Sequence, residues 1–424
     1  MSVNEAPVEE VRSGQSLFIA GLGIGQIISW GTLYYSFPLI AEPMGRDLGL
    51  SKPEVYGAAT IGLLFASFTA YPIGTMIDRG YGRAVMTSGS ILAALLFLAW
   101  SRIEDLWTLY LLLAGMGLAQ AMTLYEPAFA VIAKRYGAEV RRGITALTLW
   151  GGFASTVFVP LTQLLLNQTG WRHTLVALGL ANLLGVALHS LIINPKAEAC
   201  AVEPSPLLSH KAPLTGRHAV RWALHQRAFW GLLLAFTAYY ATFSGLTFHL
   251  YPLLIEGGFE ASTVVAAIAF MGPAQVAGRI MVWVIAERVS VRVMGKIVVL
   301  AFPIALLLLI LLPPAFASLV VYTVIYGAAN GILTIVRGLA VPEMLTREAY
   351  GAINSILTIP ATITKASAPL GVALLWAATA SYDGVLVAVL ASSALLVGGF
   401  WFAAAQTTPL KHERVPLGIY PDLR

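Results

Sequence analysis

The sequence predicts an all-α membrane protein in which twelve transmembrane helices form two pseudo-symmetric six-helix bundles. Of its 424 residues, 58% are hydrophobic and only 11% are charged, whereas charged residues make up about a quarter of a soluble globular domain. Apolar runs of about 20 residues, long enough to cross roughly 30 Å of hydrocarbon as helices, recur along the chain. These runs lack the alternating polar and apolar pattern of a membrane β-barrel, so we expect helices.

The positions of the apolar runs define the predicted organisation. The longest polar interval, 195–227, is rich in proline and basic residues, is partly amphipathic near its end and separates six runs from six. The predicted spans are 17–40, 55–77, 84–101, 106–133, 143–166, 174–193, 228–255, 262–286, 293–312, 315–341, 351–379 and 384–405. We therefore expect a tail (1–16), an N-terminal bundle (17–194), a linker (195–227), a C-terminal bundle (228–405) and a second tail (406–424).

Basic residues predict the orientation. Of the 26 Lys and Arg residues, 19 fall in or directly beside the tails, the even-numbered loops and the linker, and only four fall in the odd-numbered loops. Because short cytoplasmic loops carry an excess of Lys and Arg, we expect both termini and the linker in the cytoplasm. The expected location is the inner (plasma) membrane.

A short loop between the second and third predicted spans carries an unusual charge pattern. The stretch 74–83 contains Asp78, Arg79 and Arg83, and a fainter copy at 283–292 lies 209 residues later in an equivalent gap. An acid and two arginines in a tight turn between membrane helices can fix adjacent helices to each other.

Two further matches between the halves support an internal duplication. The stretch 31–40 aligns with 245–254 at an offset of 214, and Thr123–Glu126 aligns with Thr334–Arg337 at an offset of 211. Three matches in the same order predict parallel repeats, which are related by an axis along the membrane normal.

The loop 74–83 resembles the G-x-x-x-D-R-x-G-R-R signature of major facilitator superfamily transporters, and it retains Gly74, Asp78, Arg79 and Arg83. The resemblance covers essentially the whole chain. It implies that Asp78 bonds helix termini across an inter-helix interface, and that the arginines help to hold an outward-facing state.

A narrower resemblance is to the monocarboxylate and oxalate–formate branch of this superfamily. The stretches that carry it are 35–39, 132–152, 170–172 and 275–279. Two positions depart from the branch, because Leu39 stands where its lysine would be and Gln275 where its aspartate would be. The branch links both residues to proton-coupled carboxylate uptake, so the resemblance leaves a coupling proton open.

Four charged residues stand out inside predicted spans, and each costs about 3 kcal/mol at membrane depth unless it meets a partner or a cavity. They are Glu126, Arg279, Arg337 and Lys365, with a summed charge of +2. A surplus of positive charge in a poorly hydrated cavity favours an anionic substrate. Arg279 and Lys365 lie near mid-span and are our first choices for contacting it.

Structural roles compete with these assignments. Glu126 and Arg337 occupy equivalent repeat positions towards the cytoplasmic ends of their helices. They either form an ion pair that gates the cavity, or contact the substrate or carry a proton. Arg279 could instead satisfy carbonyls at a helix break near Pro273, and Lys365 could snorkel or pair structurally.

Uncharged candidates lie on the helices expected around the cavity. Tyr35 and Tyr125 could contact an amphipathic ligand, although most membrane aromatics simply pack. Gln120 and Asn330, related by an offset of 210, could donate hydrogen bonds to substrate or tie helices together. His249 could bind substrate or shuttle protons, or pack as a satisfied histidine.

The expected function is secondary transport of a small organic anion, monocarboxylate-like, by alternating access of a monomer. One alternative is an efflux transporter for hydrophobic or cationic compounds, which predicts an acidic cavity. Another is a membrane receptor that binds ligand without moving it. No phosphate-binding loop, nucleophile–base pair or metal-ligand spacing is visible in the sequence, so we expect no enzyme activity, cofactor, metal or nucleic-acid partner.

Overall fold

The computed structural model describes residues 8–136, 140–194, 216–285, 289–345 and 350–406, and these ranges contain helices without β-strands. The first half comprises α1 (Val8–Trp30), η1 (Gly31–Tyr35), α2 (Phe37–Leu48), α3 (Lys52–Met76), η2 (Ile77–Tyr81), α4 (Gly82–Trp100), α5 (Leu106–Thr123), α6 (Tyr125–Tyr136), α7 (Val140–Gly151) and α8 (Ala154–Ile192). The second half comprises α10 (Gly216–His225), α11 (Arg227–Glu256), α12 (Ala261–Ala269), α13 (Met271–Ile285), α14 (Val291–Leu311), α15 (Phe316–Met344), α16 (Tyr350–Thr379) and α17 (Asp383–Gln406).

Ten stretches within the described residues are long and apolar enough to cross a membrane, where the sequence predicts twelve. One of them, Gly143–Ile192, covers both the fifth and the sixth predicted spans. Inside it, Gly170 has φ of 74°, a left-handed conformation that favours glycine and ends one helix before the next begins. The second predicted span, 55–77, coincides with α3 but is not among the ten.

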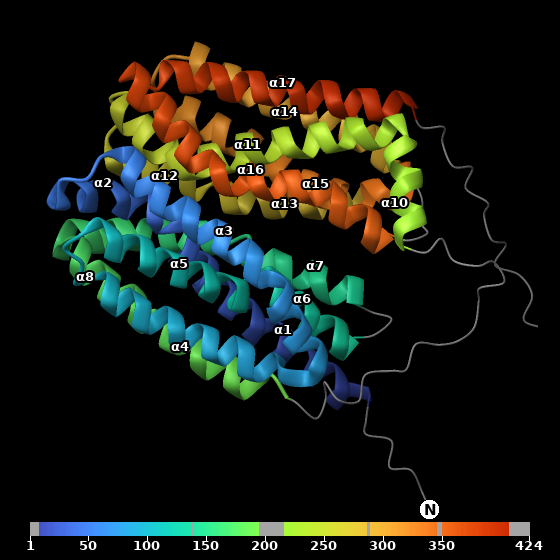
Figure 1. The fold of residues 1–424 in the computed structure, drawn as a ribbon, viewed down its shortest axis with the longest axis horizontal. Coiled ribbons are helices and arrows are strands. Elements are labelled where there is room, and N and C mark those ends of the chain that lie inside the picture. The colour runs from blue at the N-terminus through green and yellow to red at the C-terminus, as the bar shows by residue number, and fades with distance from the viewer. Residues whose placement is uncertain (1–7, 137–139, 195–215, 286–288, 346–349, 407–424) are drawn as a thin grey trace, which may run out of the picture.

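The two halves form two helical bundles that lie side by side, blue to green and yellow-green to red in Figure 1. Contacts between the bundles are made by α3 with α16, by α8 with α12 and α13, and by α2 with α11. Small residues permit the α8–α13 contact, since a Cβ on Gly272 would lie 2.5 Å from the carbonyl oxygen of Gly152.

At one end of the molecule an ion pair joins the two bundles, and a second ion pair within the first half supports it. The ammonium of Lys52 lies 3.5 Å from Glu42 and 3.3 Å from Glu256, and it sits 3.6 Å from the ring centre of Trp376. The Trp376 indole N–H in turn donates to the Glu256 carboxylate at 3.0 Å. Because these groups join α2 and α3 to α11 and α16, we call this region, defined by Glu42, Lys52, Glu256 and Trp376, the ion-paired end.

The first membrane helix is interrupted where it approaches the centre of the molecule. Residues Gly31–Tyr35 form a short π-helical segment between α1 and α2, and such segments frequently mark functional sites. The side-chain amide of Gln120 donates to the Leu33 carbonyl at 2.9 Å. A second break separates α5 from α6, and there Gln26 donates to the Thr123 carbonyl at 2.8 Å. Both amides satisfy backbone groups where the helices are interrupted at membrane depth.

The loop with the charged signature forms η2. Gly80 adopts φ of 92°, which a residue with a side chain rarely tolerates. The side chains of Arg79 and Arg83 are exposed. The Asp78 side chain and residues 286–288 of the second copy lie outside what the structure describes, so the predicted role of Asp78 stays a prediction.

Candidate functional site

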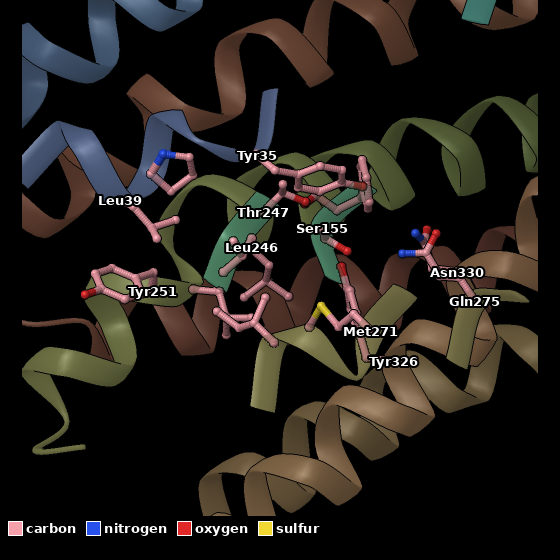
Figure 2. Close-up of a pocket in the computed structure, with 15 residues that line it drawn as sticks. Tyr35, Leu39, Ser155, Leu246, Thr247, Tyr251, Met271, Gln275, Tyr326 and Asn330 are labelled. Atoms are coloured by element: carbon pink, nitrogen blue, oxygen red, sulfur yellow. The ribbon is translucent and has the colours of Figure 1, made fainter. Parts of the chain in front are cut away.

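A cavity of about 50 Å³ lies between the two bundles, and both contribute to its wall (Figure 2). Its lining consists of Tyr35, Pro38, Leu39, Ser155, Val159, Phe243, Leu246, Thr247, Leu250, Tyr251, Ile268, Met271, Gln275, Tyr326 and Asn330. The first half supplies the first five of these residues through η1, α2 and α8. The π-helical segment therefore places Tyr35 at the interface between the halves.

The cavity wall is polar at one end and mainly apolar at the other. Gln275 and Asn330 lie together at one end of the labelled residues in Figure 2, and Leu39 and Tyr251 lie at the opposite end. The aliphatic part of the lining consists of Leu39, Val159, Leu246, Leu250 and Ile268. Such an amphipathic wall suits a ligand with one polar and one apolar end.

Two buried hydroxyl groups in the wall have no hydrogen-bond partner. Ser155 and Tyr326 are each about 3% exposed, and neither the Ser155 Oγ nor the Tyr326 hydroxyl is bonded. Buried polar groups are normally satisfied by protein or by ordered water. These two hydroxyls are consequently available to a water molecule or a bound ligand.

Arg279 lies next to the polar end of the cavity. It follows Gln275 by four residues and so occupies the same face of α13, one turn further along. Its side chain is 6% exposed, its Nη1 donates to the Thr148 carbonyl of the other half, and its Nε has no partner.

Lys365 approaches the first half across the interface. Its ammonium lies 5.7 Å from the ring centre of Tyr34 and 6.0 Å from that of Trp30. Pro369 cannot donate to the Lys365 carbonyl four residues earlier, and the Ser244 hydroxyl replaces that bond at 2.6 Å. The Ser244 hydroxyl thus satisfies the Lys365 carbonyl that Pro369 leaves unbonded within α16.

The third membrane cation, Arg337, is held by an aromatic ring. Its Nη1 donates to the Tyr240 hydroxyl, and the guanidinium lies 4.8 Å from the centre of that ring. Glu126, at the start of α6, is exposed. The two side chains, which the sequence suggests as an ion pair, are not within salt-bridge distance here.

None of the three membrane cations has a carboxylate partner among the described residues. The ion pairs in that part of the chain join Lys52 to Glu42 and Glu256, and Arg172 to Asp47. All of them lie in or near the loops between helices. The positive charge of these three residues is therefore not neutralised by acidic side chains of the described chain, and none of the three lines the cavity.

Gln120 and Asn330 tie helices together in the two halves. Gln120 bonds the Leu33 carbonyl and does not line the cavity, whereas Asn330 accepts a hydrogen bond from Tyr239 and does line it. Tyr125 is partly buried and packs at 5.0 Å from Trp30 and 5.1 Å from Phe129, measured between ring centres. Of Gln120, Tyr125 and Asn330, only Asn330 lines the cavity.

His249 is fully buried away from the cavity wall. Its Nε2 lies 2.9 Å from the Pro369 carbonyl and its Nδ1 lies 3.0 Å from the Tyr382 hydroxyl. Since a carbonyl can only accept, Nε2 carries the proton and Nδ1 accepts from Tyr382. Tyr56 stacks on the ring at 4.0 Å. This geometry is that of a satisfied packing histidine.

Sequence reasoning missed Ser155 and Tyr326 as members of the wall. Tyr326 precedes Asn330 by four residues, so the helical spacing would have placed both on one face. Ser155 gave no comparable signal, because its exposure to the cavity depends on how α8 packs against α12.

A family model described as Major Facilitator Superfamily matches residues 22–364 of the chain. Monocarboxylate transporter 13 of Rattus norvegicus is 28% identical over 374 residues, which cover 84% of this chain and 79% of that protein. Monocarboxylate transporter 11 of Homo sapiens is 32% identical over 277 residues, covering 62% of this chain and 54% of that protein.

Two solved structures share the fold. A bacterial homolog of the human lysosomal transporter Spinster, in an inward-facing and unoccupied conformation, has a TM-score of 0.70 at 15% identity and covers 93% of this chain and 98% of its own. The nucleoside transporter NupG has a TM-score of 0.66 at 13% identity, with the same coverage. At these identities the likeness concerns the fold alone.

Proposed function

The chain belongs to the Major Facilitator Superfamily, and from that premise we propose that it is a secondary transporter of a small organic anion, monocarboxylate-like, that works by alternating access. It is a multi-pass membrane transporter and not an enzyme. The relatives named as monocarboxylate transporters support the choice of substrate class.

The observation that carries the proposal is the buried Arg279 guanidinium beside the cavity. Its Nε lacks a partner, and no described carboxylate lies within salt-bridge distance. An arginine at membrane depth costs about 3 kcal/mol when unpaired, and a substrate carboxylate would compensate through charge-assisted hydrogen bonds. The guanidinium binds a carboxylate through two parallel N–H donors, whereas it cannot accept from a cation.

Lys365 supplies a second positive charge and extends this argument. In the proposal its ammonium, which faces Tyr34 and Trp30 of the other half, attracts the anion and draws the bundles together around it. Arg337 and Glu126 form an ion pair at the mouth of the cavity when that mouth closes. Asp78, Arg79 and Arg83 act in the same switch from the loop between helices.

The ion-paired end supports an alternating-access assignment. Lys52, Glu42 and Glu256 close that end in this structure, while Glu126 and Arg337 are apart. The distribution of basic residues predicts cytoplasmic termini. In the proposal the protein lies in the plasma membrane, its ion-paired end faces outwards, and substrate reaches the cavity from the cytoplasm. Leu39 and Gln275 stand where the related branch has the lysine and the aspartate linked to proton coupling, so the proposal does not assign a coupling ion.

The test is exchange of a labelled short-chain monocarboxylate across proteoliposomes that contain the purified protein. We expect the wild type to exchange the label, Arg279→Gln to abolish exchange, and the exposed loop variant Arg102→Gln to match the wild type. Exchange by Arg279→Gln at the wild-type rate would overturn the assignment. Binding without exchange would identify a receptor, and exchange restricted to hydrophobic cations would identify an efflux transporter.

A further inference from the structure

The cavity also indicates how a substrate is oriented and which tails it accepts. Resting on the proposed function, we propose that Leu39, together with Val159 and Ile268, forms a tail-selecting wall. The carboxylate of the substrate lies towards Arg279, and an uncharged apolar tail lies against Leu39. The site therefore takes short amphipathic monocarboxylates and rejects dicarboxylates and zwitterions.

Leu39 is placed for this role by the packing between the halves. It belongs to α2 in the first half, yet it is 3% exposed and packs in the same hydrophobic cluster as the core of the second half. Val159 of α8 joins the same cluster, as does Ile268 of α12. All three side chains line the cavity. Both halves therefore build the wall that would meet the substrate tail.

The charges around the cavity explain why a second ionised group is excluded. No residue of the cavity lining is ionised at neutral pH, because its polar members are hydroxyl and amide side chains. At the ion-paired end, Lys52 already pairs with Glu42 and Glu256. A charged group placed at Leu39 would lose its hydration without gaining a partner.

Tail burial gives this wall a measurable signature. Each methylene transferred from water to an apolar site improves affinity about fourfold. Affinity should rise along a series of acids until the tail fills the space in front of Leu39. Beyond that length an added methylene must displace packed side chains, and the gain stops or reverses.

The experiment is competition by unlabelled acids against the exchange of a labelled monocarboxylate in proteoliposomes. The competitors are acetate, propionate, butyrate, pentanoate, hexanoate and the dicarboxylate succinate. For the wild type we expect inhibition to strengthen about fourfold per methylene up to a limiting length, and succinate to fail as a competitor. For Leu39→Ala we expect the limiting length to move by at least one methylene, because the wall recedes.

Leu178→Ala is the matched control, since Leu178 is a buried leucine of the first half that does not line the cavity. It should keep the wild-type limit. If Leu39→Ala does not fold, Leu39→Val makes a smaller change in the same direction. An unchanged limit in the Leu39 variant, or competition by succinate equal to that of butyrate, would overturn the proposal. A failure of the proposed function looks different, because then no acid of any length would compete.

Discussion

In the first half of the molecule two glutamines tie the central helices, Gln26 to the Thr123 carbonyl and Gln120 to the Leu33 carbonyl. In the second half the equivalent helices are joined by two hydrogen bonds between side chains. Arg337 donates to the Tyr240 hydroxyl, and the Tyr239 hydroxyl donates to Asn330. The ties join the same pair of helices in each repeat. The chemistry differs, because the first half uses amide side chains bonded to backbone carbonyls, whereas the second half uses bonds between side chains, one of which involves a cation.

This difference extends to the cavity. Arg279, Arg337 and Lys365 all belong to the second half, while the first half presents Trp30 and Tyr34 to the lysine. The duplication thus retained a common scaffold and placed the positive charge on one side of it. We infer that the second half recognises the anionic group and that the first half supplies walls which close on it.

The largest effect after loss of Arg279 should come from Lys365→Gln, which removes the charge that crosses the interface. We expect about a tenfold weaker anion affinity, equivalent to about 1.4 kcal/mol, because a lysine acts as a point charge without a bidentate fork. Competition in the exchange assay measures it. Trp30→Phe, a first-half change that keeps an aromatic ring, should weaken affinity much less. Equal losses in the two variants would contradict the assignment of recognition to the second half.

The equivalent ties give a second comparison. Asn330→Ala leaves the buried Tyr239 hydroxyl unpaired, which should cost about 1–3 kcal/mol of stability, and it should also weaken substrate affinity because Asn330 lines the cavity. Gln120→Ala leaves the Leu33 carbonyl unpaired at a similar cost in stability. Thermal unfolding with and without substrate separates the two. Affinity should fall only in Asn330→Ala, and a parallel fall in Gln120→Ala would show that the first half also recognises substrate.

Lys52→Gln should have a smaller effect, at the ion-paired end. Its pairs with Glu42 and Glu256 are partly exposed, so we expect about 1 kcal/mol or less. Because the Lys52–Glu256 pair joins the two halves, its loss should speed exchange from the ion-paired end. Accessibility of a cysteine introduced at that end, in a background that lacks Cys200, reports it. Exchange and accessibility that both match the wild type would remove Lys52 from the closure.

The smallest expected effect is on stability, and it concerns the first turns of α5 and α15, which occupy equivalent positions in the two halves. Asp105 caps α5 through the Thr108 amide, and hydrogen bonds from Thr108 lower the pKa of its carboxyl. The position 210 residues later is Ala315, which begins α15 without a side-chain cap. Ala315→Asp should stabilise the second half by a few tenths to about 1 kcal/mol.

Low pH should remove the contribution of the Asp105 cap to the stability of the protein. Because its pKa is lowered in the folded state, the Asp105 carboxylate stabilises the protein above its ordinary pKa and less as pH falls through the lowered value. Melting curves of Asp105→Ala and the wild type should therefore differ at neutral pH and converge in acid. A difference that is constant with pH would show that the cap does not act through its charge.

Apolar runs and repeat offsets were enough to predict the helical fold and the cations within the spans, because membrane depth allows few charges and few backbone geometries. The family was predicted by the resemblance of the loop 74–83 to its signature. The π-helical segment at Gly31 and the partners of His249 could not be predicted, since they depend on contacts with distant helices. The separation of Glu126 from Arg337 is likewise invisible in sequence, because it depends on which end of the molecule is closed.

The most direct test of the central claim is calorimetric binding of butyrate to the purified wild type and to Arg279→Gln and Arg279→Lys. We predict that the wild type binds, that the glutamine variant binds at least about 100-fold more weakly because two charge-assisted hydrogen bonds are lost, and that the lysine variant is intermediate. Equal affinity in all three proteins would contradict the account.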